Sequence, residues 1–221
     1  MNLLKLLLAV AVVTGLHGAA WAQVACMVSG LEGQASLVRR GAQPVQLTSF
    51  KKLLPGDLVE LSAGGRLRLS FLAQGKAEAW TGPAKLSIQA DTAQDLAKGQ
   101  KPSVTSLGVD TTFIKDSPIL NDQRELVAGQ IAVRGSSSAK LENAALDPQR
   151  AQDLQKVEAE YRRLQKAMPR RDVTPHIFYL AALERLRQRK SMAELIQVLL
   201  ENDSGNLELS EMLDDLYATK P

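Results

Sequence analysis

The chain has 221 residues, of which 27 are Lys or Arg and 24 are Asp or Glu, so its formal net charge is +3. This balance excludes a histone-like protein that coats nucleic acid. The hydrophobic share of 45% and the charged share of 23% are typical of a chain that folds around a core. With one Cys and two His, the sequence excludes a disulfide framework and a Cys/His-rich zinc site.

The first 22 residues have the organisation of an export signal. Lys5 supplies positive charge, an apolar run extends from Leu6 to Leu16, and Ala20-Trp21-Ala22 has the form of a cleavage site. The run is shorter than the ~20 residues that span a bilayer. We therefore predict a signal peptide over residues 1–22, a periplasmic mature chain beginning at Gln23, and no integral membrane segment after cleavage. A retained N-terminal anchor is the alternative.

After cleavage, Cys26 is the one remaining thiol, and it cannot close an internal disulfide. The thiol is then free, cross-linked to another chain, or lipidated at a mature N-terminus. The preceding Gln23-Val24-Ala25 lacks the Leu-like residue of a lipidation signal. A free or intermolecular thiol is therefore favoured.

Apolar and polar residues alternate over residues 28–91, with Gly and Pro between the short runs. Leu67, Leu69 and Phe71, for example, alternate with polar residues. This period of two predicts short antiparallel strands that form a meander or a small barrel. Ala63-Gly64-Gly65-Arg66 and Gln74-Gly75 predict tight hairpins, because Gly tolerates the positive φ of such turns.

Four motifs follow one another in this region: Val28-x-Gly30 with Gly33-x-Ala35-x-Leu37-x-Arg39, Leu54-Pro55-Gly56-Asp57-x-Val59, Gly65-x-Leu67-x-Leu69-x-Phe71, and Gly82-Pro83-Ala84-x-Leu86-x-Ile88. In this order they resemble a FecR-type domain. The resemblance implies an all-β extracytoplasmic module. In its namesake, this module senses an occupied outer-membrane receptor and signals through a membrane helix to a cytoplasmic sigma-factor regulator. We expect neither that helix nor that cytoplasmic region here.

Two residues of the β region each allow a structural and a functional interpretation. Asp57 follows Gly56 at a turn, where a carboxylate accepts hydrogen bonds from backbone amides, and this interpretation is favoured over a ligand or a catalytic acid. Trp80 stands beside Gly82-Pro83. It is either an anchor of the last hairpin or an exposed residue for partner docking.

The middle of the chain, residues 93–140, is predicted to hold a linker and additional strands. Residues 92–104 have the composition of a loop. Residues 111–114 are rich in β-branched and aromatic side chains, and residues 129–135 alternate between two glycines. Both stretches are therefore predicted as strands, and a strand like the second follows the sensor-like region in some exported FecR-like proteins.

Helical signals begin at Asp147-Pro148, an N-cap followed by Pro at the first helical position. A stripe with helical spacing follows, and Pro169 ends it; the stripe consists of Leu154, Val157, Tyr161, Leu164 and Met168. Thr174-Pro175 predicts the start of a second helix. The sequence therefore changes from a period of two to a period of 3.6 near residue 140.

Two more helices are predicted near the C-terminus. Ser191-Met192-Ala193-Glu194 has the form of a capping box, with Ser191 as the N-cap. A last helix is predicted to carry Leu209, Met212, Leu213, Leu216 and Tyr217. Residues 145–221 are thus predicted to form a small all-α bundle.

Charge separates along the helical part. The basic residues are Arg162, Arg163, Lys166, Arg170, Arg171, Arg185, Arg187, Arg189 and Lys190, and the acidic ones are Glu201, Asp203, Glu208, Glu211, Asp214 and Asp215. The basic group either faces anionic lipid, an acidic glycan or an acidic protein, or is a solvated face with pairs such as Glu158–Arg162. The candidate docking residues are Trp80, Arg162, Arg163, Arg170 and Arg171.

No nucleophile, phosphate-loop or metalloprotease motif is present, and His176, at a helix start, is the one histidine of the mature chain. We therefore expect no enzyme, no cofactor and no metal, with a hydrolase built on two carboxylates as the remaining alternative. Aromatic residues are not interleaved with the basic ones, so nucleic acid is not an expected partner.

The sequence thus predicts an α+β protein of two segregated parts: a FecR-like β domain over residues 27–92 and a helical domain over residues 145–221. The predicted function is a non-enzymatic periplasmic binding or scaffold protein that recognises an envelope protein or glycan. The alternative is a component of an extracytoplasmic sensing system that relays to a separate membrane regulator.

Overall fold

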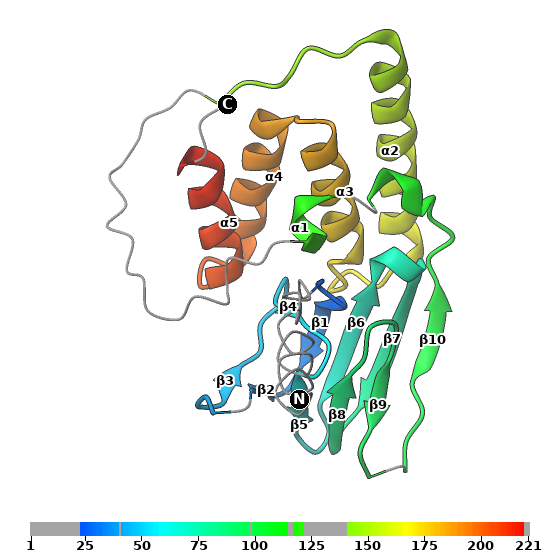
Figure 1. Ribbon diagram of the computed structural model, residues 1–221, viewed down its shortest axis with the longest axis vertical. Helices are drawn as coiled ribbons and strands as arrows, with labels where there is room; N and C mark the ends of the chain where they lie inside the picture. The colour runs from blue at the N-terminus through cyan, green and yellow to red at the C-terminus, as the bar shows by residue number, and fades with distance from the viewer. Residues whose placement is uncertain (1–22, 40, 98, 115–116, 122–140, 219–221) are drawn as a thin grey trace, which may run out of the picture.

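The computed structural model describes residues 23–39, 41–97, 99–114, 117–121 and 141–218. Strands occupy the first half of the chain and helices the second, in the order that the change of period predicts (Figure 1). The described strands form two antiparallel sheets of five strands each. The chain therefore has an α+β architecture.

Two predictions concern residues outside this description. The export signal over residues 1–22 is one, and the strand over residues 129–135 is the other. Among the described helices, none combines the length and the apolar character needed to cross a membrane.

The sheets differ in their strand order. Sheet A has the order β10 (Ser103–Ser106), β7 (Lys76–Thr81), β6 (Arg66–Phe71), β1 (Cys26–Glu32) and β4 (Lys52–Leu53). Sheet B has the order β3 (Val45–Gln46), β2 (Ala35–Val38), β5 (Leu58–Leu61), β8 (Ala84–Ile88) and β9 (Ala93–Asp95). Each sheet ends in two edge strands within the described residues, so the closed-barrel alternative was wrong.

The predicted alternation places apolar side chains between the sheets. On β6, Leu67, Leu69 and Phe71 are buried, whereas Arg66 is exposed. The strands of both sheets contribute to one apolar cluster, which includes Cys26, Leu37, Val59, Trp80, Leu86 and Ile88. Burial of this inner face holds the two sheets face to face, whereas the ladder bonds join the strands within each sheet.

Ala63-Gly64-Gly65-Arg66 is not a hairpin, contrary to the prediction. The strand before it, β5, pairs with β2 and β8, and the strand after it, β6, pairs with β1 and β7. The turn therefore crosses from sheet B to sheet A. A local sequence signal marks a turn but does not show which strands pair. The Gln74-Gly75 hairpin is confirmed, since β6 and β7 pair on either side of it and Gly75 has a φ of 62°.

The turn between β5 and β6 is held by close contact between its backbone and the backbone of Gly82. A Cβ at Gly82 would lie 1.8 Å from the carbonyl oxygen of Ser62, so only glycine fits there. The amide of Gly82 donates to the carbonyl of Gly65 over 2.8 Å. Gly82-Pro83, which connects β7 of sheet A to β8 of sheet B, thus packs against the turn that connects β5 to β6.

The middle of the chain differs from its prediction in two places. Residues 92–104, predicted as a loop, contain β9 and the first residues of β10. Residues 111–114, predicted as a strand, instead form a 3-10 helix, η2 (Thr111–Phe113), and its C-cap. The side chain of Asp110 accepts from the amide of Thr112 at the helix start, and this capping interaction outweighs the β propensity of the Thr and Phe residues.

The helical part contains α2 (Pro148–Ala167), α3 (Thr174–Arg185), α4 (Arg189–Asn202) and α5 (Leu207–Ala218), preceded by the short α1 (Pro118–Asn121). The long helices stand side by side in chain order beyond one end of the sheets (Figure 1). The predicted starts at Asp147-Pro148 and Thr174-Pro175 are confirmed, and the Asp147 carboxylate accepts from the amide of Arg150 over 2.8 Å.

The predicted capping box at Ser191 was wrong, because α4 begins before it, at Arg189. The amide of Ser191 donates to the side-chain oxygen of Asn143 over 3.1 Å, and the Asn143 side chain donates to the Ser191 hydroxyl over 2.9 Å. A side chain 48 positions earlier therefore supplies the cap that the local motif predicts for Ser191 itself.

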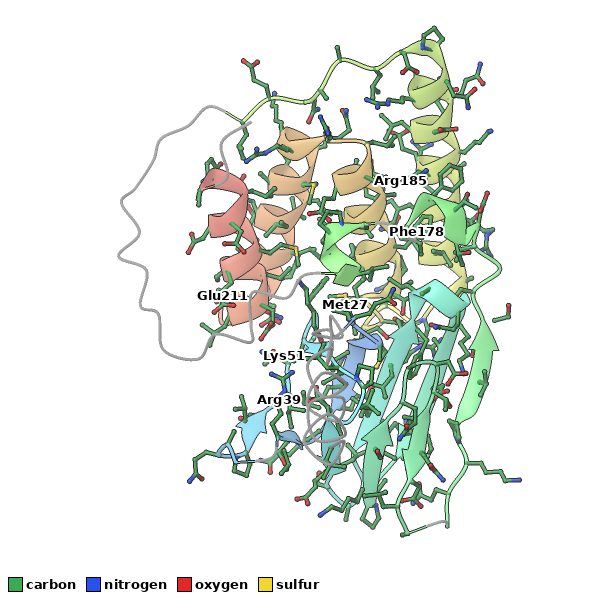
Figure 2. The ribbon with its side chains drawn as sticks, viewed as in Figure 1. Met27, Arg39, Lys51, Phe178, Arg185 and Glu211 are labelled. Carbon is green, nitrogen blue, oxygen red and sulfur yellow. The ribbon has the colours of Figure 1, made fainter. Side chains whose placement is uncertain are left out.

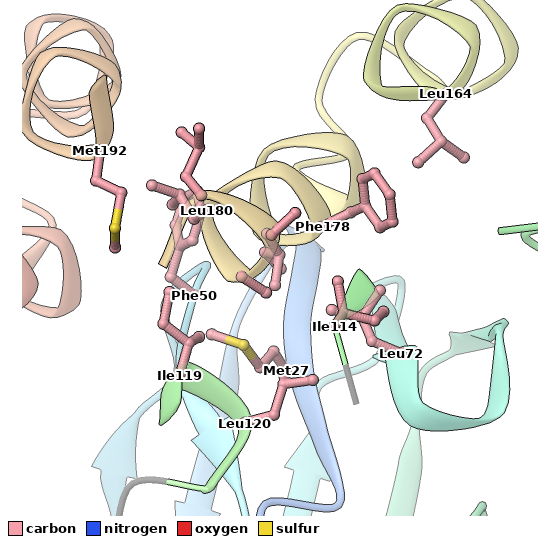
Figure 3. Close-up of a cluster of buried hydrophobic side chains, with 14 of the residues drawn as sticks. Met27, Phe50, Leu72, Ile114, Ile119, Leu120, Leu164, Phe178, Leu180 and Met192 are labelled. Atoms are coloured by element: carbon pink, nitrogen blue, oxygen red, sulfur yellow. The ribbon is translucent and has the colours of Figure 1, made fainter. Parts of the chain in front are cut away.

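One apolar core joins the sheets to the helices. It contains Met27 of β1 and Phe50 of the loop before β4, which lie against Phe178 and Leu180 of α3 (Figure 3). The same cluster continues to buried residues of α2, α4 and α5, namely Val157, Leu164, Met192, Ile196 and Leu209. The helices thus cover apolar side chains that sheet A turns away from sheet B.

The segment after β10, residues 107–114 and 117–121, crosses from the sheet to the helices, and we call it the strap. Its apolar side chains, Leu107, Ile114, Ile119 and Leu120, are buried in the shared core (Figure 3). Arg163 of α2 donates to the carbonyl of Leu107, and Arg185 of α3 donates to the carbonyl of Thr112. The strap therefore links sheet A to two helices.

Polar contacts also tie α5 to the β region. Lys51 pairs with Glu208 over 2.9 Å at the boundary between strands and helices (Figure 2). Asn206 donates to the carbonyl of Ser49 and accepts from the amide of Leu209 at the start of α5. One side chain thus caps the last helix and attaches it to the loop that carries Phe50.

Candidate functional site

The turn between α2 and α3 positions the candidate site. Pro169 follows the end of α2, and the Asp172 carboxylate accepts from the amide of Thr174 over 2.8 Å where α3 begins. The other oxygen of Asp172 lies 2.5 Å from Arg68 of β6. The same carboxylate therefore starts α3 and attaches the turn to sheet A.

A β-bulge provides a second attachment. The register of β1 with β6 shifts between Val28 and Gly30, which leaves Ser29 outside the regular ladder. The carbonyl of Ser29 accepts from the amide of Val173 over 2.7 Å. Beside it, the hydroxyls of Ser70 and Thr174 lie 2.6 Å apart and share a buried hydrogen bond. These contacts fix the start of α3 on the sheet.

Three aromatic side chains gather where α2 and α3 pack, and we call Tyr161, His176 and Tyr179 the aromatic seam. The rings of Tyr161 and Tyr179 stack with centroids 4.5 Å apart and planes 12° apart. The His176 ring meets Tyr161 at an edge, with centroids 5.6 Å apart. All three are half-buried, so the seam presents aromatic surface to solvent beside the charged face of α2.

Burial dominates the titration of the seam. It raises the pKa of Tyr161 and of Tyr179, which remain neutral phenols at physiological pH. Burial lowers the pKa of His176 from its ordinary value, and the nearby Asp172 carboxylate opposes that change. Burial therefore disfavours charge on all three seam residues, and the positive charge near the seam belongs to the neighbouring basic residues.

That face carries a line of cations, and we call Arg162, Lys166, Arg170 and Arg171 the cationic ridge. Arg162 and Lys166 stand four residues apart on one side of α2, and Arg170 and Arg171 follow in the turn after the helix. All four are exposed. Arg162 lies 3.5 Å from Glu158, whereas Lys166, Arg170 and Arg171 make no ion pair with any described residue. The arrangement suits an anionic partner.

The other two candidate docking residues lie elsewhere. Arg163 pairs with Glu160 and donates to the carbonyl of Leu107, so its side chain connects α2 to the strap. Trp80 is 3% exposed in the core between the sheets, and its indole N–H donates to Glu78. This position fits the anchor interpretation of Trp80 and leaves no exposed ring for docking.

The side chains that the sequence offers for catalysis or ligand binding are Asp57, Cys26 and His176, and the three do not lie together. Asp57 accepts two hydrogen bonds from Arg39 and one from the amide of Leu54, as a turn residue does. The Cys26 thiol is buried between the sheets, where burial and the nearby carboxylates raise its pKa well above the ordinary range. His176 lies on α3, apart from that core. No cluster of three or more His, Cys, Asp or Glu within the described ranges is suited to hold a metal ion.

A shallow groove of about 500 Å³ lies on the outer face of sheet B. Five of its seven lining residues are polar, and all come from β2, β3 and β5 with their neighbouring residues: Gln34, Ala35, Ser36, Gln46, Glu60, Leu61 and Ser62. Glu60 is engaged by Lys85 over 2.7 Å. The groove has no aromatic lining and no unpaired charge, so the helical face offers the stronger binding chemistry.

Sequence reasoning missed the aromatic seam. Tyr161 was assigned to the apolar stripe of the first helix, and Tyr179 was not singled out. The available signal was that His176 and Tyr179 are three residues apart, a spacing that places both on one face of α3. The stacking of Tyr179 on Tyr161 depends on how α2 and α3 pack, which no local pattern shows.

Comparison with known proteins gives no relative: no family model, no curated protein and no solved structure matches the chain.

Proposed function

We propose that the protein is a non-enzymatic binding or scaffold protein of the periplasm, with a FecR-like β region, and that its helical part docks an anionic component of the cell envelope. The signal-like residues 1–22 support export, and the ordered motifs of residues 28–91 support the FecR-like assignment. The single observation that carries the docking function is the cationic ridge beside the aromatic seam.

The ridge has the properties of a recognition surface. Seven basic residues stand against three acidic ones between residues 148 and 171, and three of the ridge cations have no carboxylate partner in the described chain. Each Lys or Arg near an anionic surface contributes about 1 kcal/mol of attraction. The neighbouring tyrosines add rigid apolar surface with a hydroxyl group at the edge. Together they suit an anionic glycan or an acidic protein segment.

Charge reversal on the ridge tests this function. The variant Lys166→Glu with Arg170→Glu removes two ridge cations, so at about 1 kcal/mol each it should weaken binding to immobilised lipopolysaccharide or to purified acidic envelope proteins by roughly 30-fold or more. The matched control is Lys101→Glu, which changes an exposed lysine of the β region. Circular dichroism checks that all variants fold alike.

The outcomes separate the two partner classes. Selective loss of lipopolysaccharide binding identifies a glycan-type partner, and selective loss of protein binding identifies an acidic protein. Binding should also fall as salt rises, because exposed charges are screened over about 8 Å at physiological ionic strength. Equal binding of the ridge variant and the Lys101→Glu control would contradict the proposed docking surface.

A specific observation also favours the alternative, a sensing component that relays to a membrane regulator. The strap leaves sheet A at β10 and is bonded to α2 through Arg163 and to α3 through Arg185. A change in the position of β10 would therefore move residues that α2 and α3 bind directly. If relay is the function, Arg185→Ala should abolish a transcriptional response that the gene deletion also abolishes, while leaving envelope binding intact.

A further inference from the structure

The outer strand of sheet A, β10, is open on three sides. It pairs with β7 from Ser103 opposite Ala79 to Ser106 opposite Lys76, and no described strand lies on its other side. All four of its residues are exposed, and Val104 keeps 57% of its surface accessible. Neither sheet B nor the helices cover this strand.

The backbone groups that face away from β7 can be assigned by alternation. The amide of Leu107 donates to the carbonyl of Gly75 over 2.8 Å, so the backbone of Leu107 faces β7. Since successive residues of a strand face opposite sides, Thr105 and Ser103 also face β7. The N–H and C=O groups of Val104 and Ser106 then face outward, and no hydrogen bond in the described structure engages them on that side.

The other edge strands are shorter or protected. β3 and β4 have two residues each. β9 has three, and its Asp95 carboxylate accepts from the amides of Ala97, Gly99 and Gln100, which folds the following loop tightly at that edge. β10 has four residues and contains none of the charges, prolines or bulges that keep exposed edges from pairing.

We infer that β10 is a docking edge for an extended segment of a partner protein, which adds to sheet A as a sixth strand. The outward N–H and C=O groups of Val104 and Ser106 are complementary to the backbone of another extended segment. The β-branched Val104 and Thr105 favour a segment that places a β-branched or aromatic residue beside them. This edge is separate from the cationic ridge, so the inference stands apart from the proposed docking of an anionic component.

The length of β10 favours a peptide segment over a second copy of the chain. Two four-residue strands pair along only about 14 Å, at ~3.4 Å per residue. Such a contact is far smaller than the ~1,000 Å² that a specific interface between two folded proteins needs. A flexible segment, in contrast, can continue past both ends of β10 and add contacts there.

The direction of the amides provides a matched pair of variants. Val104→Pro removes an outward N–H and leaves the bonds to β7, so it should fold normally and block strand addition. Thr105→Pro removes an inward N–H, so it should lower the melting temperature by breaking the ladder. Val104→Lys is the second blocking variant, because it keeps the amide and adds a charge to the edge.

The probe is a phage-displayed library of random short peptides selected on the full-length protein. We expect enriched peptides with alternating apolar residues, which bind Val104→Pro and Val104→Lys at least about tenfold more weakly than the parent protein. They should bind the Lys166→Glu, Arg170→Glu variant as well as the parent. Recovery of no binding peptide, peptides that bind Val104→Pro undiminished, or a dimer that Val104→Pro dissociates would overturn the inference.

Discussion

Glu78 shows at the residue scale how a buried charge is accommodated. Its side chain is fully buried, and its two oxygens accept from Lys76, Trp80 and Thr92 and from the amide of Ala93. The carboxylate thereby connects β7 of sheet A to the start of β9 in sheet B. A buried carboxylate with four donors is a structural tie, so its burial gives no evidence of catalysis.

The chain contains a matched pair that isolates the effect of burial. Glu78→Ala removes a buried acceptor and leaves its donors unpaired, so it should lower the free energy of unfolding by about 3–5 kcal/mol. Glu60→Ala breaks the exposed pair with Lys85, which should cost no more than about 1 kcal/mol. Urea denaturation measures both. Similar losses in the two variants would show that the Glu78 network is not the tie described.

His176 predicts a pH dependence of stability. Burial lowers the pKa of the folded imidazole below its ordinary value of 6.5, and its Nδ1 atom is buried without a hydrogen-bond partner in the described structure. As the pH falls through about 6.5, the unfolded chain therefore takes up this proton before the folded chain does, and stability falls. The contribution is fully present above that pH and is lost progressively below it.

The variant His176→Gln tests this assignment, because it cannot titrate. Between pH values above and below 6.5, the parent protein should lose more unfolding free energy than His176→Gln does. Chemical denaturation at each pH measures the difference. If the free energies of unfolding of the parent and of His176→Gln differ by the same amount at every pH, the role of His176 is contradicted.

At the scale of elements, the loop before β4 carries an unusual backbone. Phe50 has a φ of 70° and is 3% exposed, with its ring in the core shared by sheet and helices. Its amide donates to the carbonyl of Val28. A bulky residue at positive φ is strained, so the burial of the ring and the contacts of its loop must outweigh that strain.

Two substitutions separate the ring from the backbone strain. Phe50→Ala removes a large buried ring and should lower the free energy of unfolding by about 3–5 kcal/mol. Phe50→Gly removes the same ring but relieves the strain, so it should be more stable than Phe50→Ala by roughly 1 kcal/mol. Equilibrium urea unfolding compares them. A glycine variant less stable than the alanine variant would contradict the strained conformation.

The elements that the sequence predicts well are those whose signals are local. The alternation of Leu67, Leu69 and Phe71 and the cap at Asp147-Pro148 depend on neighbouring residues, and both are found where predicted. Strand pairing is not local, so Ala63-Gly64 suggested a hairpin where the chain changes sheets. The start of α4 is capped by Asn143, which is far away in the sequence. The strand β10 was missed because all its residues are exposed, so its burial does not alternate.

The candidate site divides in the same way. The cationic ridge is visible in the sequence because its four basic residues cluster between residues 162 and 171. The aromatic seam is not, because it forms only when α3 packs on α2 and brings Tyr179 against Tyr161. Trp80 is a candidate that the structure removes. Its position beside a turn is compatible with an exposed ring, but the pairing of β6 with β7 places the ring in the core.

At the scale of the whole molecule, the β region and the helices share one of two apolar clusters, and the other cluster lies between the two sheets. Met27 and Phe50 from the β region and Phe178 and Leu180 from α3 belong to the same cluster. Arg68, Asp172 and the Ser29 carbonyl attach the start of α3 to sheet A beside this cluster. The cationic ridge and the aromatic seam are therefore held in place by the sheet as well as by the helices.

Taken alone, the helical part would lose the apolar contacts that it shares with the β region. The chain over residues 145–221 would expose the face of α3 that covers Met27 and Phe50, and it would lose the strap contacts of Arg185 and Glu184. Its cooperative folding should therefore depend on the β region. The central claim is that the two parts unfold as one unit.

Urea unfolding followed by two signals tests that claim most directly. In the Trp21→Phe variant, Trp80 is the sole tryptophan, so its fluorescence reports the core between the sheets, while far-UV circular dichroism reports mainly the helices. A shared core predicts that the two transitions coincide in midpoint and steepness. Loss of the helical signal at a urea concentration where Trp80 fluorescence is still native would contradict it.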